Sequence, residues 1–230
     1  MSKVSHGFFS FTEVTDPSAH AAYNAGHQLD HLPEQYPLAG IVHGQRWVST
    51  PQCRAARAVN GSALDPIHYV TCYLMSEPIQ QTLDDFFALG AELHRLNRFF
   101  GARRALLTGP FRARETVAAP RVLVSAAAVP YRPHRGVYVV VEGPTEADLT
   151  GALLAQQGVA GAWAFTTDPA LTSRRWTAGA RRITVAWLDD APLAVADRIA
   201  PIVAGRSGVE FAGPFETITP WQWGWFEPHD

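Results

Sequence analysis

The stretches Gly136–Glu142 (GVYVVVE) and Arg182–Leu188 (RITVAWL) decide the fold of this 230-residue chain. β-Branched and aromatic residues dominate both stretches, as is typical of β-strands. Within Val137–Val141 and Ile183–Leu188, both alternating sets of side chains are apolar. Such strands need apolar cover on both faces of their sheet. We therefore expect helices against one face and a second layer of the protein against the other.

Four further segments complete the second half of the chain. Segment 145–157, with its acidic first turn, and segment 191–204 are predicted to be helices. Segments 162–167 and 209–219 are rich in β-forming residues and are predicted to be strands. The resulting order of strand, helix, strand, strand, helix, strand is that of a ferredoxin-like unit.

The first half of the chain has the same predicted order. Its strands are expected at 7–14, 40–50, 68–75 and 106–117, and its helices at 19–32 and 79–100. A short sequence echo falls in the last segment of each half, as Thr108–Phe111 (TGPF) and Ala212–Phe215 (AGPF). The same echo at the same place in two parallel element orders indicates a tandem repeat.

These patterns predict an α+β chain made of two tandem ferredoxin-like βαββαβ halves. Residues 1–120 form the N-terminal half, 121–135 a linker, and 136–230 a C-terminal half with a Trp-rich tail. A ferredoxin-like sheet carries its helices on one face, so the other face needs cover. We expect the two antiparallel sheets to pack face to face as an α/β barrel, with a ligand cavity between them.

Composition narrows the classes of function. The net charge is −2 and no basic stripe is present, which argues against a nucleic-acid partner. Only two cysteines occur, Cys53 and Cys72, and they do not form a zinc-binding pattern. No segment approaches the ~20 apolar residues needed to cross a bilayer, and no apolar leader opens the chain. We expect a cytoplasmic protein with no membrane partner.

Arginines occur in adjacent pairs, as at Arg103-Arg104, Arg174-Arg175 and Arg181-Arg182. Each pair precedes or begins an apolar run. The simpler interpretation is a solvated loop or strand end, and the functional one is a clamp for a substrate carboxylate.

The residue types best suited to chemistry lie in the first predicted helix. Tyr23, His27 and His31 are spaced i, i+4, i+8 and therefore share one face of that helix. Imidazole titrates near neutral pH, so it can accept and return a proton. We predict His31 and His27 as catalytic acid–base residues, with a structural role at the helix end or surface as the alternative.

Two strands supply the other candidates. His43, Gln45 and Trp47 alternate with a face that carries Arg46. We favour the His43 face as the wall of the cavity. The alternative is that the Arg46 face lines the cavity, where Arg46 would orient a carboxylate.

In the strand at 68–75, Tyr69 and Tyr73 share the more polar face. We predict Tyr69 as a catalytic residue that polarises a substrate oxygen, and Tyr73 and Tyr23 as substrate-binding residues. Buried tyrosines that serve only the core are the alternative.

The same region carries a family resemblance. Tyr23, His27, the triplet His31-Leu32-Pro33 and the segment Gly40–Trp47 together resemble the EthD-like branch of the dimeric α/β-barrel superfamily. The resemblance implies a barrel of two ferredoxin-like sheets. It also implies that the histidine before the proline, His31 here, faces the cleft. The second histidine, at position 27, departs from the usual pattern.

Residues and resemblance together predict a cofactor-independent lyase, isomerase or cyclase. Its substrate would be a small aromatic, polyketide-like or lactone or carboxylate metabolite. A cofactor-free monooxygenase and a non-catalytic protein that binds a small ligand are the alternatives. No cofactor is expected; haem held by one histidine, or a divalent metal held by His27 and His31 with Glu34 or His43, is a weaker hypothesis. The predicted partner is a small molecule, and a homodimer stays open.

Overall fold

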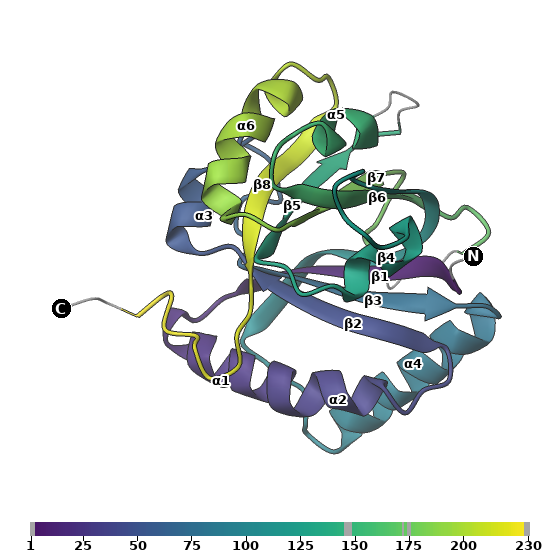
Figure 1. Cartoon of the computed structure of the whole chain (residues 1–230). Coiled ribbons are helices and arrows are strands. Elements are labelled where there is room, and N and C mark those ends of the chain that lie inside the picture. Colours follow the sequence, from purple (N-terminus) through teal and green to yellow (C-terminus); the bar gives the residue numbers. More distant parts are fainter. Residues whose placement is uncertain (1–2, 145–148, 172, 174–175, 228–230) are drawn as a thin grey trace.

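Eight antiparallel strands close into one barrel, with the helices on its outside (Figure 1). This computed structural model describes residues 3–144, 149–171, 173 and 176–227, and every structural statement below concerns those residues. Around the barrel the strands follow the order β1-β3-β2-β8-β5-β7-β6-β4. The predicted α+β barrel of two antiparallel sheets is confirmed.

The first half contributes strands β4-β1-β3-β2 in spatial order. Its elements along the chain are β1 Val4–Val14, η1 Pro17–Ala19, α1 His20–Ala25, η2 Gly26–His31, α2 Leu32–Gln35, β2 Ile41–Val48, α3 Pro51–Ala55, β3 Tyr69–Ser76, α4 Ile79–Arg95 and β4 Arg103–Ala118. The predicted helix 19–32 is thus one continuous run from η1 to α2, and the predicted helix 79–100 ends at Arg95. The short helix α3 was not predicted.

The second half contributes β8-β5-β7-β6. Its elements are β5 Gly136–Glu142, α5 Thr150–Leu154, β6 Val159–Thr167, β7 Arg182–Leu188, α6 Pro192–Ala204 and β8 Val209–Thr217. Residues 145–148 of the predicted helix 145–157 lie outside the described residues. Between the halves, the stretch predicted as a linker contains the 3₁₀ segment η3 Ala126–Tyr131, whose Val129 is buried in the barrel core.

Two seams join the halves into one barrel. The longer seam pairs β4 with β6, and the shorter one pairs β2 with β8 through Trp47 and Val48. The two Gly-Pro-Phe segments occupy matching places, since Gly109 lies opposite Phe9 on β1 and Gly213 lies opposite Val139 on β5. Each half therefore uses this segment to pair its last strand with its first.

Side chains of the described residues fill the barrel interior, and the cavity described below lies outside the barrel and not between the sheets as predicted. An eight-stranded barrel is just wide enough for its side chains to fill it. Large aromatic rings from both halves do so here, all almost fully buried: Phe9, Phe11, Trp47, Phe111, Trp163, Phe165, Trp187, Phe211 and Phe215. Burial of each such side chain stabilises the fold by roughly 1.5–3 kcal/mol. The interior is the main core of the protein.

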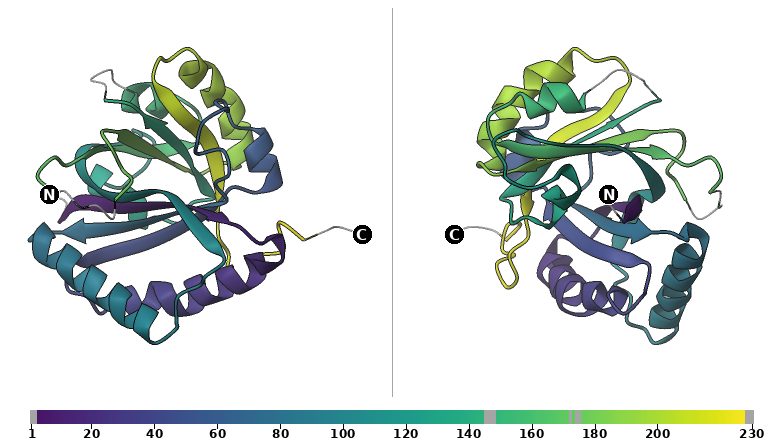
Figure 2. Two further views of the ribbon diagram at one scale, coloured as in Figure 1. Left: turned by 180° about the vertical axis from the view of Figure 1, so that it is seen from behind. Right: turned by 45° about the vertical axis from the view of Figure 1, so that its right-hand side comes forward.

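The helices of the two halves pack differently on the outside of the barrel. Helices α5 and α6 lie directly on the second-half sheet, where Leu153, Val195 and Ile199 are fully buried against Tyr138 and Val140. Helices α1, α2 and α4 cover the first-half sheet on the opposite side of the barrel (Figures 1 and 2). They leave a space over that sheet, which is described below.

No helix within the described ranges combines the length and the apolar character that a bilayer-spanning segment requires. The cytoplasmic location expected from the sequence stays a prediction.

Candidate functional site

A cavity of about 1070 Å³ lies between the outer face of the first-half sheet and the helices that cover it. Its floor comes from β1, β3 and β4, and its walls come from η2, α2, α4 and the loop after α4. The volume lies at the upper end of the range for small-molecule sites, roughly 300–1,000 Å³. The lining side chains used below are Phe8, Tyr23, His27, His31, Tyr73, Phe86, Phe87, Phe99, Arg103 and Trp176.

The wall that carries both histidines is a π-helical segment, Gly26–His31. Pro33, two residues further on, has no N–H to donate to the carbonyl four residues back. The N–H of Leu32, just before this proline, donates to the carbonyl of His27, five residues back, which is the π-helical pattern. Short π-helical segments within α-helices are rare and frequently lie at functional sites. The local sequence thus widens the helix at the point where its histidines meet the cavity.

His27 and His31 lie edge to face along this wall, with ring centroids 4.8 Å apart. The His27 ring also meets the edge of Tyr23, and the His31 ring packs against Phe99. Burial, followed by the charges of Arg103 and Arg46, lowers the pKa of His31 to about 4. Burial and Arg46 hold the pKa of His27 well below its ordinary value. Both imidazoles are therefore neutral at pH 7, the form in which histidine binds metals.

Within the described part of the chain, four residues of the cavity wall each have an enclosed polar atom without a hydrogen-bond partner. These atoms are Nδ1 of His27, Oε1 of Gln35, Oη of Tyr73 and Nε1 of Trp176. Burial raises the pKa of Tyr73, so its hydroxyl keeps its proton and can donate. Buried polar groups are nearly always hydrogen-bonded, and exceptions call for an explanation such as a bound group or water. Their position around one cavity indicates a ligand site.

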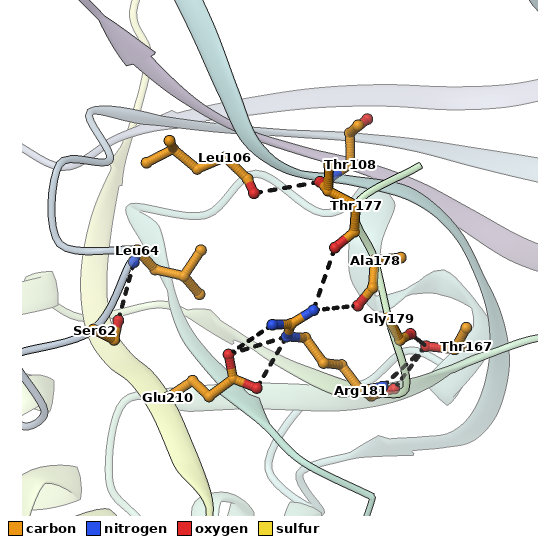
Figure 3. Close-up of polar contacts among 10 residues, drawn as sticks. All are labelled: Ser62, Leu64, Leu106, Thr108, Thr167, Thr177, Ala178, Gly179, Arg181 and Glu210. Atoms are coloured by element: carbon orange, nitrogen blue, oxygen red, sulfur yellow. Dashed lines mark hydrogen bonds and ion pairs between the residues drawn. The ribbon is translucent and has the colours of Figure 1, made fainter. Parts of the chain in front are cut away.

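The second half of the chain closes one side of this first-half cavity through Trp176. The neighbouring Thr177 holds the loop to β4, because its Oγ1 donates to the carbonyl of Leu106 and accepts from the N–H of Thr108 (Figure 3). Arg181 braces the same loop: it donates to the carbonyl of Ala178 at 2.6 Å and pairs with Glu210 on β8 (Figure 3). Trp176 reaches the cavity from this braced loop and stacks near Phe87.

Tyr69 and Arg46 do not line the cavity, although sequence reasoning placed both in the site. Tyr69 is fully buried under α1, where its hydroxyl accepts from Nδ2 of Asn24 at 2.8 Å and shares a 2.8 Å hydrogen bond with His20. Arg46 lies on the same outer face of the sheet and donates to the amide oxygens of Asn24 and Gln28. Its guanidinium also lies 5.6 Å from the centroid of the Tyr69 ring. These groups support the π-helical wall from behind.

His43, Gln45 and Trp47, predicted as substrate-binding residues, point into the barrel and do not line this cavity. Trp47 donates through Nε1 to Nε2 of His134 at 2.9 Å, and Gln45 accepts from Nε1 of Trp187 at 3.2 Å. His43 packs near Tyr131. The strand register gives the reason: Gly44 and Arg46 pair with Tyr73 and Thr71, whereas Gln45 pairs with Cys72. The His43 face and the tyrosine face are therefore opposite faces of one sheet.

Four of the predicted site residues come together in the cavity: Tyr23, His27, His31 and Tyr73. Sequence reasoning missed its aromatic walls, above all Phe86 and Phe87 on α4. One feature of the sequence could have predicted these walls: the inner face of α4 carries more aromatic residues than are needed to cover a short four-stranded sheet. Trp176 gave no signal, because it lies in an irregular loop of the other half.

Comparisons with known proteins locate the fold. The sequence matches no protein-family model, and it matches no curated protein. Among solved structures, a protein described as a putative chlorite dismutase, TA0507, is similar over 95% of this chain and 96% of its own, with 6% identity and a TM-score of 0.54. This likeness shows that the two chains share one fold.

A mutant chlorite dismutase from Candidatus Nitrospira defluvii is similar over 94% of this chain and 92% of its own, with 10% identity and a TM-score of 0.46. Chlorite dismutase-like proteins, the class named in the description of TA0507, are typically haem-dependent. This finding contradicts the prediction of a cofactor-independent lyase, isomerase or cyclase, with its cofactor-free alternatives, and the prediction that no cofactor is used. Both predictions were inferred from two histidines, a residue type that suits acid–base chemistry and metal ligation equally well.

Proposed function

We propose that this chain binds haem in the cavity between the first-half sheet and its helices, where the imidazole of His31 would hold the iron and His27 lies beside it. One observation carries the proposal. Two neutral imidazoles lie in the wall of a wide aromatic cavity, and four of its described lining residues have enclosed polar atoms without partners.

The cavity suits haem in size and in chemistry. A haem site needs an axial ligand such as histidine and a broad apolar pocket. The volume is about 1070 Å³. Phe8, Phe86, Phe87 and Phe99 supply flat apolar walls against which a planar ring can pack.

A tetrapyrrole fits these residues better than a bare metal ion does. Structural zinc sites take four protein ligands and catalytic ones take three. Across the ranges the structure describes, no three His, Cys, Asp or Glu side chains come together as metal ligands. Glu34 instead pairs with Arg98, and His43 lies in the barrel. Haem brings four nitrogen donors of its own, so one imidazole from the protein is enough.

The two histidines have different access to a ligand. Nδ1 of His27 is enclosed by protein atoms, whereas neither ring nitrogen of His31 is enclosed or hydrogen-bonded within the described residues. His31 is therefore the better ligand, and His27 packs against it and helps to fix its ring. When bound, haem would supply redox or oxygen chemistry. The chain's own residues would hold it, exclude water and keep His31 unprotonated.

Finer assignments within the superfamily belong to this proposal too. The His31-Leu32-Pro33 triplet at the end of a cavity-lining helix supports placement in the EthD-like branch. The matching positions of the two Gly-Pro-Phe segments support a tandem duplication with halves at 1–120 and 136–230. The proposal covers haem binding and does not extend to the chlorite chemistry named in the neighbours' descriptions.

Titration of the purified protein with hemin, followed by absorbance, tests the proposal. One equivalent per chain is expected to give a shifted and sharpened Soret band typical of histidine ligation. His31→Ala is expected to remove that band, and His27→Ala to weaken binding. His94→Ala is the matched control, because His94 is an exposed histidine on α4 that does not line the cavity. Equal spectra for His31→Ala and wild type would reject His31 as the ligand.

A further inference from the structure

The arginine pair at the start of β4 is divided between two environments. Arg104 is engaged, because its guanidinium donates twice to Oε2 of Glu13, at 3.0 and 2.7 Å. Arg103 points to the opposite side of the strand and lines the cavity. Its guanidinium lies over the ring of Phe99, 5.1 Å from the centroid. Among the residues that the structure describes, Arg103 forms no ion pair.

The charged groups around the cavity leave this cation uncompensated. Asp30 and Glu34 line the cavity from η2 and α2, but Asp30 is exposed and Glu34 pairs with Arg98 at 3.4 Å. Behind the wall, Arg46 is buried at 4% exposure, and no carboxylate in the described ranges lies within ion-pair distance of it. Arg103 thus lines the cavity without an anionic partner among the described residues, and Arg46 adds a second positive charge behind the wall. Arg103 is half-buried, and an anionic group on the ligand would give it a carboxylate partner like the one that Arg104 already has.

We infer that the ligand of this cavity carries a carboxylate that pairs with Arg103, while its ring system lies toward His27 and His31. Guanidinium binds carboxylate through two parallel hydrogen bonds, and stacking on Phe99 holds the Arg103 plane in place for them. The inference rests on the proposed function for the place of binding and is independent of the metal.

Fluorescence titration with metal-free protoporphyrin IX, a dicarboxylic acid, and with its dimethyl ester tests the inference without iron. Wild type is expected to bind the free acid at least about tenfold more tightly than the ester, as expected for a charge-assisted pair. Arg103→Gln is expected to lose most of this preference, and Arg103→Lys to keep part of it. Arg104→Gln is the matched control, as a neighbouring arginine that already has its own carboxylate, and should behave as wild type.

The two proposals fail in different ways. Equal affinity of wild type for acid and ester, no binding of the acid, or an unchanged preference in Arg103→Gln would overturn the role of Arg103. A preference that depends on Arg103, together with hemin spectra that do not depend on His31, would leave the carboxylate inference standing and reject the haem proposal. Melting temperatures of the Arg103 variants within a few degrees of wild type show that the fold is intact.

Discussion

Filling the cavity from α4 should stabilise the protein and block its ligand. Gly90 lies on the inner face of α4 with Leu83, Phe86, Phe87 and Leu93, and a Cβ built on it meets nothing within 4 Å. Gly90→Phe removes a glycine from a helix interior, which is favourable by about 0.5 kcal/mol. Full burial of a phenyl ring contributes roughly 1.5–3 kcal/mol. About half of that is expected here, and ordering the ring costs about 0.5–1 kcal/mol.

The net effect is a gain of about 1 kcal/mol, or roughly 2–4 °C in melting temperature for a chain of this size. Urea unfolding measures the gain, and hemin titration measures the loss of binding, expected to be at least about tenfold. Ala88→Phe places the same ring on the exposed face of α4. It should neither increase the free energy of unfolding nor weaken hemin binding. A destabilised Gly90→Phe protein, or one with unchanged hemin affinity, would refute the assignment of the cavity.

Three further outcomes follow from the structure. The pKa of His31 is lowered to about 4 in the folded state, so its contribution to stability is full above pH 6.5 and is lost as pH falls from 6.5 toward 4. Between pH 6.5 and pH 5, the free energy of urea unfolding should fall by up to about 2 kcal/mol more in wild type than in His31→Asn. The same pH dependence in both proteins would contradict this. Gly109→Val should destabilise by about 1–3 kcal/mol, because φ is +153° there and the new Cβ would lie 2.9 Å from Cβ of Ala178. Thermal unfolding checks it, and an unchanged melting temperature would count against the close approach of the loop. Arg46→Met should cost about 1–3 kcal/mol in the free energy of unfolding, since the Oδ1 atom of Asn24 loses its donor; a more stable variant would show that the buried charge is a net burden.

The strands could be predicted from the sequence because their pattern needs no long-range knowledge. Gly136–Glu142 and Arg182–Leu188 match the observed β5 and β7 at both ends. Both faces of these strands are apolar, and only burial on both sides suits such a pattern. The closed barrel follows from the same fact, since each sheet supplies the cover that the other needs.

The place of the cavity could not be predicted, because β2 has polar residues on both faces. Gln45 is acceptable inside the barrel only because Trp187 and the carbonyl of Pro130 are its partners. Arg46 is acceptable outside because Asn24 and two tyrosine rings surround it. These partners are distant in sequence, so the alternation of residues did not show which face is open. The π-helical turn at 26–31 was hidden for a similar reason, since helical periodicity does not distinguish it from an α-helix.

The most direct test of the account is a crystal structure of the hemin complex with an anomalous map recorded at the iron edge. The account predicts one iron peak per chain, in the cavity between β1, β3 and the α1–α2 run, within ligation distance of a ring nitrogen of His31. An iron peak over the second-half sheet, inside the barrel or on the surface would contradict it.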